Sequence, residues 1–282
     1  MLPYSDILLT VDYDRTMTGP DSKVPERNIE AVRYFMERGG AFTLNTGRSV
    51  SLGKRLTEKV PVNAPLLLFN GSVAYEDGQI LYYHTIDAPM WEMVMAVAEA
   101  FPELNVEIQA LDGHYLINPK QSFTALYDNM KWPYQIAVPG EDLGPFVKFA
   151  IYGQMHTGRL ADMYVGTEKE MADMQALDAF IKERWDDKLD LFYAAPRILD
   201  VQPKGINKGV AARELLERLG RKILVCVGDA ENDLSMLDAA DFAFCPSDGV
   251  IADRYSTVCI CGEGAVADVI YKKIPEILQI QP

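Results

Sequence analysis

Residues 7–16 decide the fold, and they read Ile7-Leu8-Leu9-Thr10-Val11-Asp12-Tyr13-Asp14-Arg15-Thr16. The first five residues are almost entirely apolar, which is typical of a strand buried on both faces of a parallel sheet. This run ends in two acidic residues separated by a tyrosine. Because ligands of open parallel sheets lie beyond the carboxyl ends of the strands, the stretch predicts both a fold class and one edge of a functional site.

The chain after this stretch alternates between predicted helices and strands. Pro25 opens a helix whose apolar residues recur at helical spacing, and a pair of glycines closes it. Further strands are expected over residues 41–44 and 66–69, with a helix over residues 49–59 between them. This order predicts an α/β fold with a Rossmann-like, doubly wound parallel sheet and right-handed crossovers.

The alternating pattern stops after residue 71 and returns near the end of the chain. A hairpin is expected around residues 76–78, and short strands with two main helices follow. We interpret residues 85–194 as an inserted α+β cap domain, whose size lies in the normal domain range. The core is therefore expected to be discontinuous and to consist of residues 1–84 and 195–282.

The composition excludes several classes of protein. The 282 residues are 49% hydrophobic and 24% charged, as in ordinary globular proteins. The 27 basic and 41 acidic side chains give a net charge of −14, which repels nucleic acids and anionic membrane surfaces. The sequence shows no segment that could cross a bilayer and no signal-peptide pattern at its start, so we expect a cytoplasmic protein without nucleic-acid or membrane partners. The oligomeric state is not indicated.

Histidine and cysteine are used sparingly in this chain. The three histidines, His84, His114 and His156, are widely scattered, which argues against a histidine-based metal centre and against a Ser-His-Asp triad. The four cysteines are too few for a disulfide framework in a chain of this length. Any metal site is therefore expected to use oxygen ligands.

Polar residues, two of them next to a glycine, follow each predicted core strand. They are Asp12 and Asp14, Thr46 and Gly47, Asn70 and Gly71, and Asp229, Asn232 and Asp233. If the four aspartates meet at one rim, each pair of like charges about 4 Å apart repels by roughly 4 kcal/mol at an effective dielectric constant of about 20. Such a rim needs a cation, and oxygen ligands without clustered His or Cys favour Mg²⁺.

The other polar groups at these strand ends are suited to binding phosphate. Thr46 offers a hydroxyl and Gly47 a backbone N–H, while Lys208 offers an ammonium and Asn232 an amide. Each group alone also has a structural explanation, because acidic residues after strands often cap helices and helical lysines are usually solvated. Together, carboxylates, Mg²⁺ and a phosphate clamp predict phosphoryl transfer.

With these motifs the chain resembles the haloacid dehalogenase superfamily, specifically its Cof-like phosphatases with a large C2-type cap. The resemblance rests on four motifs in order, which are Asp12 to Thr16, Thr46 to Arg48, Lys204 to Gly209 and Gly228 to Asp233. It implies that Asp12 is the nucleophile that forms an aspartyl-phosphate and that Asp14 is the general acid and base. It further implies that Mg²⁺ is held by Asp12, the backbone carbonyl of Asp14 and Asp229 with support from Asp233, and that Lys208 and Thr46 orient the transferring group.

The function implied by this resemblance is that of a phosphoric monoester hydrolase acting on small phosphorylated metabolites, with sugar phosphates as one candidate class. Two alternatives remain open at the level of sequence: a phosphomutase of the phosphomannomutase type, and a phosphometabolite-binding protein without turnover. One departure from the family pattern is Arg15, which stands where many relatives have glycine. Its guanidinium could bind an anionic substrate or simply be solvated.

Overall fold

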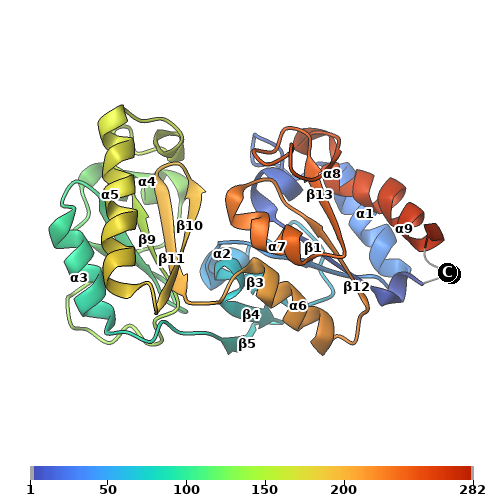
Figure 1. Cartoon of the computed structure of the whole chain (residues 1–282), viewed down its shortest axis with the longest axis horizontal. Helices are drawn as coiled ribbons and strands as arrows, with labels where there is room; N and C mark the ends of the chain where they lie inside the picture. The colour runs from blue at the N-terminus through green and yellow to red at the C-terminus, as the bar shows by residue number, and fades with distance from the viewer. Residues whose placement is uncertain (1–2, 281–282) are drawn as a thin grey trace. The chain divides into compact units, whose positions relative to one another are not determined.

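The computed structural model describes residues 3–280, which form two compact units (Figure 1). Within that range, the residues up to Arg48, Gly53–Tyr82 and those from Asn207 onward form the core unit. Ser49–Leu52 and Tyr83–Ile206 form the other, which we call the inserted unit. None of the helices in the described range is long and apolar enough to span a membrane.

The core unit is built on a five-stranded parallel sheet with the strand order β14-β13-β12-β1-β2. Its strands are β1 (Ile7–Val11), β2 (Ala41–Leu44), β12 (Ile223–Val227), β13 (Phe242–Pro246) and β14 (Ser256–Val258). Every residue of β1, β2 and β12 is buried, as expected for strands covered on both faces. The predicted α/β fold with a doubly wound parallel sheet is confirmed.

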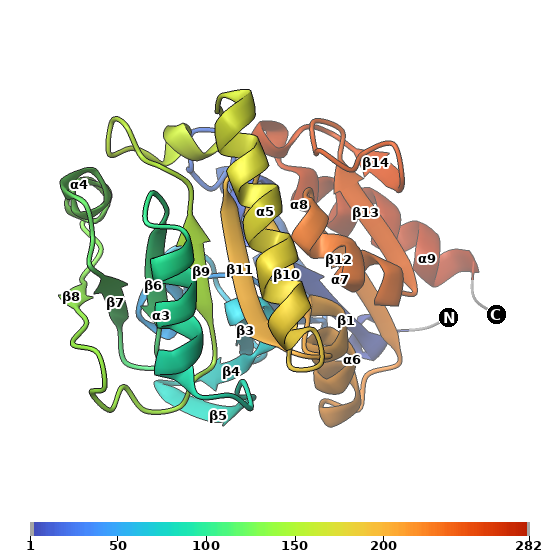
Figure 2. The same cartoon turned by 60° about the vertical axis from the view of Figure 1, so that its left-hand side comes forward.

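Helices cover both faces of this sheet. Figures 1 and 2 show α6 (Lys208–Arg218) and α7 (Leu234–Ala239) on one face, with α1 (Glu26–Glu37), α8 (Ala265–Asp268) and α9 (Ile274–Ile280) on the opposite face. Successive side chains of a strand point to opposite faces, so Leu8 of β1 packs with α6 and α7 while its neighbours face the other layer. Because β1, β2 and β12 are parallel, their carboxyl ends lie at the same edge of the sheet.

The strand expected at residues 66–69 joins a different sheet. β3 (Leu66–Leu68) pairs antiparallel with β4 (Val73–Glu76), and β5 (Gln79–Tyr83) completes a three-stranded sheet. One parallel bridge, between Asn45 and Leu67, connects β3 to the end of β2. The predicted hairpin is present between β4 and β5, where Asp77 and Gly78 have the positive φ angles, 47° and 88°, that a tight hairpin turn requires.

The inserted unit contains a six-stranded sheet with the order β10-β11-β9-β6-β7-β8. Its strands are β6 (Asn105–Gln109), β7 (His114–Ile117), β8 (Gln135–Ile136), β9 (Phe149–Tyr152), β10 (Leu189–Ala195) and β11 (Ile198–Pro203). α3 (Met90–Ala100) and α5 (Glu168–Trp185) cover one face of this sheet (Figure 2). α4 (Gln121–Met130) packs against Leu116 and Tyr152, whose side chains belong to the other face.

Two boundaries in the structure differ from those expected. The sequence predicts a helix over residues 49–59, but α2 spans only Val50–Gly53 and is followed by turns. The boundary expected between residues 194 and 195 falls inside the antiparallel pair of β10 and β11. Since a hairpin holds its two strands together by backbone hydrogen bonds, both remain with the inserted unit and the core resumes at Asn207.

Candidate active site

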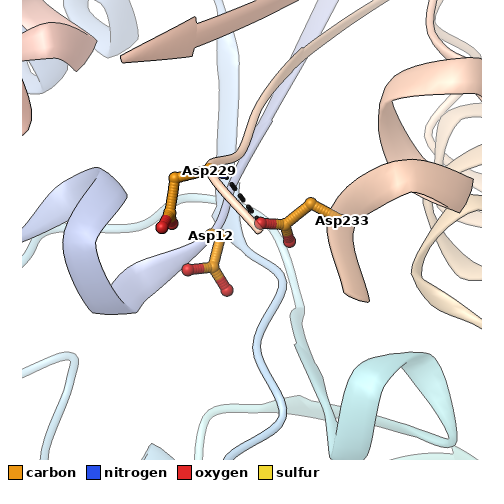
Figure 3. Close-up of side chains that lie close together, drawn as sticks. All are labelled: Asp12, Asp229 and Asp233. Atoms are coloured by element: carbon orange, nitrogen blue, oxygen red, sulfur yellow. Dashed lines mark hydrogen bonds between the residues drawn. The ribbon is translucent and has the colours of Figure 1, made fainter. Parts of the chain in front are cut away.

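Three aspartates meet at the carboxyl edge of the core sheet. Asp12 directly follows β1, and Asp229 follows β12, which is the strand hydrogen-bonded to β1 with Val11 opposite Val227. Asp233 ends the short helical turn of residues 231–233. One carboxylate oxygen from each of the three lies within 4.8 Å of the others, and Figure 3 shows Asp12 beside Asp229 and Asp233, which come from one loop far along the chain.

Lys208 lies in the same cluster, at the first turn of α6. Its Nζ donates to Oδ1 of Asp12 at 2.5 Å and to Oδ1 of Asp233 at 2.6 Å, and the side chain is 0% exposed. Asn207 caps α6 by accepting hydrogen bonds from the backbone N–H groups of residues 209 and 210, both at 3.0 Å. Asn45 donates to the backbone carbonyl of Lys208 at 2.9 Å. These contacts fix the ammonium between the two carboxylates.

The cluster carries more negative than positive charge. Burial raises the pKa of Asp12, and only Lys208 opposes this effect appreciably. Burial and the neighbouring Asp233 raise the pKa of Asp229 to about 7. Burial lowers the pKa of Lys208, but the attraction of the Asp12 and Asp233 carboxylates outweighs this effect, and the net pKa is raised. Three buried carboxylates facing one ammonium are therefore a site that a divalent cation would stabilise.

The hydrogen bonds of Asp229 and Asp233 separate their roles. Oδ2 of Asp233 accepts from the backbone N–H groups of Asp229 at 2.9 Å and Ala230 at 3.1 Å, while its Oδ1 accepts from Lys208. Asp233 therefore uses both oxygens to shape the loop. Asp229 accepts from the Thr16 hydroxyl through Oδ1 at 2.7 Å. Among the described residues, the hydrogen bonds to the side chains of Asp12 and Asp229 use Oδ1 in both cases, so Oδ2 of each remains open to a further contact.

Asp14 lies outside this carboxylate cluster. Its side chain is 52% exposed and forms a bidentate ion pair with Arg48, with Nε–Oδ2 and Nη2–Oδ1 distances of 3.0 and 2.7 Å. The guanidinium of Arg48 also lies 4.7 Å from the centre of the Tyr13 ring. Sequence reasoning assigned no role to Arg48, and the only available signal was its place directly after Thr46 and Gly47.

Arg15 occupies a turn whose backbone conformation favours glycine. Its φ angle is 62°, in the left-handed region that glycine enters most easily. Its backbone N–H donates to the Thr18 hydroxyl at 3.1 Å, and its side chain is exposed. The unusual residue is thus accommodated by the backbone of the turn.

The residues expected to bind phosphate differ in their burial and in their hydrogen bonds. Thr46 is buried after β2, with its backbone N–H bonded to Leu67 and its carbonyl bonded to the N–H of Asn70, both at 2.9 Å. A Cβ on Gly47 would lie 2.9 Å from Oδ1 of Asn70, so a larger residue there would require the Asn70 side chain to move. Asn232 is half-buried on the turn between Asp229 and Asp233, and we find no hydrogen bond of its side chain among the described residues.

Comparisons with known proteins show the family of this chain. The family model for haloacid dehalogenase-like hydrolases matches residues 9–250. An HMP-PP phosphatase from Serratia proteamaculans is 25% identical over 240 residues, which are 82% of this chain and 80% of the relative. A 5-amino-6-(5-phospho-D-ribitylamino)uracil phosphatase from Bacillus subtilis is 19% identical over 252 residues, which are 87% of this chain and 88% of the relative.

A solved structure is similar over nearly the whole chain. This haloacid dehalogenase-like hydrolase from Bacteroides thetaiotaomicron has a TM-score of 0.76 at 20% identity, and the match covers 94% of this chain and 98% of the other. At this identity the likeness shows a shared fold. The matched region includes the inserted unit as well as both halves of the core.

Proposed function

The chain belongs to the haloacid dehalogenase-like hydrolases, and on this basis we propose that it is a Mg²⁺-dependent phosphatase that hydrolyses small phosphorylated metabolites. The observation that carries the proposal is the buried cluster of Asp12, Asp229 and Asp233 around the Lys208 ammonium. The phosphatase activities named for two similar proteins support the reaction class.

The donor set suits a hard divalent cation. Carboxylate and carbonyl oxygens are the ligands that Mg²⁺ prefers, and the cluster sets three buried carboxylates against one ammonium. Burial, with a smaller contribution from the neighbouring carboxylates, raises the pKa values of Asp12 and Asp229. Asp12, the backbone carbonyl of Asp14 and Asp229 would hold the ion, with Asp233 in support through its hydrogen bonds to the loop. When bound, Mg²⁺ would offset the negative charge on the transferring phosphoryl group.

Asp12 is the proposed nucleophile. Lys208 donates to its Oδ1 and thereby fixes the carboxylate, while Oδ2 attacks phosphorus. The bond between phosphorus and the leaving oxygen breaks, and an aspartyl-phosphate forms on Asp12. The Lys208 ammonium offsets part of the charge of the buried carboxylate, and Thr46 and Gly47 bind the oxygens of the transferring group, with Asn232 as a further contact.

Asp14 is the proposed general acid and base. Its carboxylate is half-exposed two residues after Asp12, so it can face the leaving group rather than the metal site. Asp14 gives a proton to the leaving alcohol in the first step and takes one from the attacking water in the second. Arg48 restrains the orientation of Asp14 through two hydrogen bonds.

The test is a panel of phosphorylated metabolites assayed for phosphate release with added Mg²⁺, in which hexose phosphates and phosphorylated pyrimidine compounds are both included. Asp12→Asn keeps the size of the side chain but removes the attacking charge, so turnover should fall by about 10³-fold or more with the fold retained. Asp21→Asn is the control, because Asp21 is an exposed carboxylate paired only with Lys23. Activity near wild type in Asp12→Asn would remove Asp12 from the mechanism.

The same panel separates the proposal from the two alternatives. A hexose 1-phosphate that is converted to the 6-phosphate without release of free phosphate would indicate a phosphomutase. Thermal stabilisation by a metabolite without any phosphate release would indicate a binding protein. All four cysteines are unbridged, which supports the reducing cytoplasm as the compartment in which we propose the reaction takes place.

A further inference from the structure

The carboxylate of Asp14 takes its orientation from a single side chain. Nε and Nη2 of Arg48 donate to Oδ2 and Oδ1 of Asp14 at 3.0 and 2.7 Å, and the part of the chain that the structure describes supplies no other hydrogen bond to this carboxylate. Asp14 follows Asp12 by only two residues, yet it lies outside the cluster of three carboxylates. A planar guanidinium that binds both oxygens sets the plane of a carboxylate as well as its distance. Arg48 therefore determines how Asp14 is turned.

Arg48 is itself held by its side chain and by its backbone. Its guanidinium lies over the Tyr13 ring, 4.7 Å from the ring centre, and Tyr13 is only 2% exposed. Its backbone carbonyl accepts from the N–H of Phe69 at 3.0 Å, and its backbone N–H donates to the Thr46 hydroxyl at 3.3 Å. These residues all belong to the core unit. The support of Asp14 is therefore complete within one unit.

The ion pair of Asp14 and Arg48 is more ordered than its exposure alone would indicate. The Asp14 side chain is 52% exposed, and ion pairs at such positions usually hold their partners only loosely. Here the guanidinium is 25% exposed, donates two hydrogen bonds and lies over a buried aromatic ring, whose charge distribution favours a cation. A general acid and base must be accessible to the reactants and yet held within hydrogen-bond reach of the proton that it transfers. An exposed carboxylate in a fixed orientation combines these two requirements.

We propose that Tyr13 and Arg48 are positioning residues of the phosphatase. The ring supports the guanidinium, and the guanidinium holds Asp14 in the orientation from which it gives a proton to the leaving oxygen and later takes one from the attacking water. The inference rests on the proposed function and gives roles to two residues outside the groups proposed to react or to bind metal and phosphate. A shift of about 1 Å in such a group costs up to about 100-fold in rate, so loss of either support should slow turnover.

The effect of removing Arg48 should depend on how basic the leaving group is. An alkoxide leaves only together with a proton, whereas 4-nitrophenolate is a weak base and leaves without one. The measurement is kcat/KM, which covers only the steps up to the aspartyl-phosphate. Arg48→Met should lower kcat/KM for the best alkyl phosphate of the panel by about 10-fold or more, but for 4-nitrophenyl phosphate by less than about threefold. Arg48→Lys keeps the charge and loses the fork, so it should show the same dependence. Equal losses with both esters would overturn the proposal, because a merely structural defect slows both alike.

A second measurement tests whether Arg48 acts through Asp14. Asp14→Ala, Arg48→Met and the double variant form a cycle, which is assayed with the same alkyl phosphate. If Arg48 only orients Asp14, the double variant should be no more than about twofold slower than Asp14→Ala. A guanidinium that binds the substrate directly would give a further loss in the double variant, and that result would also overturn the proposal.

Variants of Tyr13 and of a second stacked arginine complete the comparison. Tyr13→Phe keeps the ring and should retain kcat/KM within about twofold, whereas Tyr13→Leu removes the ring and should repeat the leaving-group dependence of Arg48→Met. Wild-type rates in Tyr13→Leu would overturn the role assigned to Tyr13. Arg38→Met is the control, because the Arg38 guanidinium also lies over a tyrosine ring, 3.4 Å from the centre of Tyr34. Arg38 precedes β2, at the opposite end of this strand from Thr46, so its removal should leave kcat/KM for both esters unchanged.

The failure of this inference differs from the failure of the proposed function. If the wild-type protein hydrolyses nothing in the panel, the proposed function fails, and crystal structures of the wild type and of Arg48→Met still test the support. The Asp14 carboxylate should be turned away from its wild-type orientation in Arg48→Met, and an unchanged orientation would overturn the inference. If Asp12→Asn is inactive while Arg48→Met matches the wild type with both esters, the proposed function stands and the support is rejected.

Discussion

The ammonium of Lys208 offsets the repulsion among the three buried carboxylates of the core unit. Its ammonium is fully buried, and the cost of burying it is offset by hydrogen bonds to Asp12 and Asp233. Removing one partner of such a cluster lowers the free energy of unfolding far more than removing a surface charge, because the remaining buried charges are left unpaired. Stability and the proposed catalysis therefore depend on the same residue.

Lys208→Met should both destabilise the protein and abolish turnover. Methionine keeps most of the apolar stem but leaves two buried carboxylates without their cation, at a cost of about 3–5 kcal/mol in the free energy of unfolding. Urea denaturation with and without Mg²⁺ measures this loss, and Mg²⁺ should recover part of it. Lys204→Met is the control, since Lys204 forms half-exposed ion pairs and should change stability by less than about 1 kcal/mol. Wild-type stability in Lys208→Met would contradict this account of the cluster.

At the scale of elements, the turn after β3 and the start of α6 approach each other closely. The turn of residues 69–71 has positive φ angles throughout, ending in Gly71 at 99°. A Cβ on Gly71 would lie 2.6 Å from Cβ of Ala211 and 2.7 Å from the backbone oxygen of Asn207. The absence of a side chain therefore lets the capped end of α6, with Lys208 as its first residue, reach the carboxyl edge of the sheet.

Gly71→Ala and Gly78→Ala form a matched pair that tests this close approach. Both glycines have positive φ angles, so each substitution carries a backbone cost of about 1–2 kcal/mol. Only Gly71 has neighbours that a methyl group would overlap, whereas Gly78 has nothing within 4 Å. Gly71→Ala should therefore lower Tm clearly more than Gly78→Ala and reduce activity by displacing Asn207. Equal losses in thermal denaturation would show that the contact with α6 is unimportant.

At the scale of the whole molecule, the active site joins the two halves of a discontinuous core. Asp12 comes from the first segment of the chain and Asp229 from the last, and they meet because β1 and β12 are neighbours. A cation bound between them would stabilise only the folded state, by about 2.7 kcal/mol at 100 times its dissociation constant. Binding of the proposed Mg²⁺ would therefore couple metal, pH and folding in this protein.

The metal-free protein should become less stable as pH rises from about 4 to 7. The pKa of Asp229 is raised from 3.8 to about 7 in the folded state, so folding takes up a proton in this range. The stabilising contribution of this group is complete below its unfolded pKa and is lost as pH rises through the folded one. Urea denaturation in EDTA at several pH values measures the free energy of unfolding and hence its slope against pH.

Mg²⁺ should reverse this trend, because the ion competes with the proton for the same carboxylate. Its stabilising effect should therefore grow between about pH 5 and 8. Asp229→Asn cannot ionise at this position, so it should lose the part of the slope assigned to Asp229 and respond weakly to Mg²⁺. An Asp229→Asn protein with the wild-type slope and the wild-type Mg²⁺ response would refute the assignment.

Local patterns predicted some elements well and others poorly. β1 and β2 lie at the residues expected, because a continuous apolar run is a property of the strand itself. α2 is much shorter than expected, since an amphipathic pattern does not show where tertiary packing ends a helix. β3 pairs with β4 although its apolar run resembles those of the parallel strands, because pairing depends on the neighbouring turn as well as on the strand.

The amino-acid sequence by itself determined the α/β core and the acidic residues at its strand ends, because strand burial and the position of a strand end are local features. Only the tertiary structure decided which side chains pair. Asp14 with Arg48, Asp229 with Thr16, and His114 with both Ser49 and Glu107 are contacts between separate elements. Such contacts depend on how the sheets and helices pack in three dimensions, and spacing along the chain carries no signal of them.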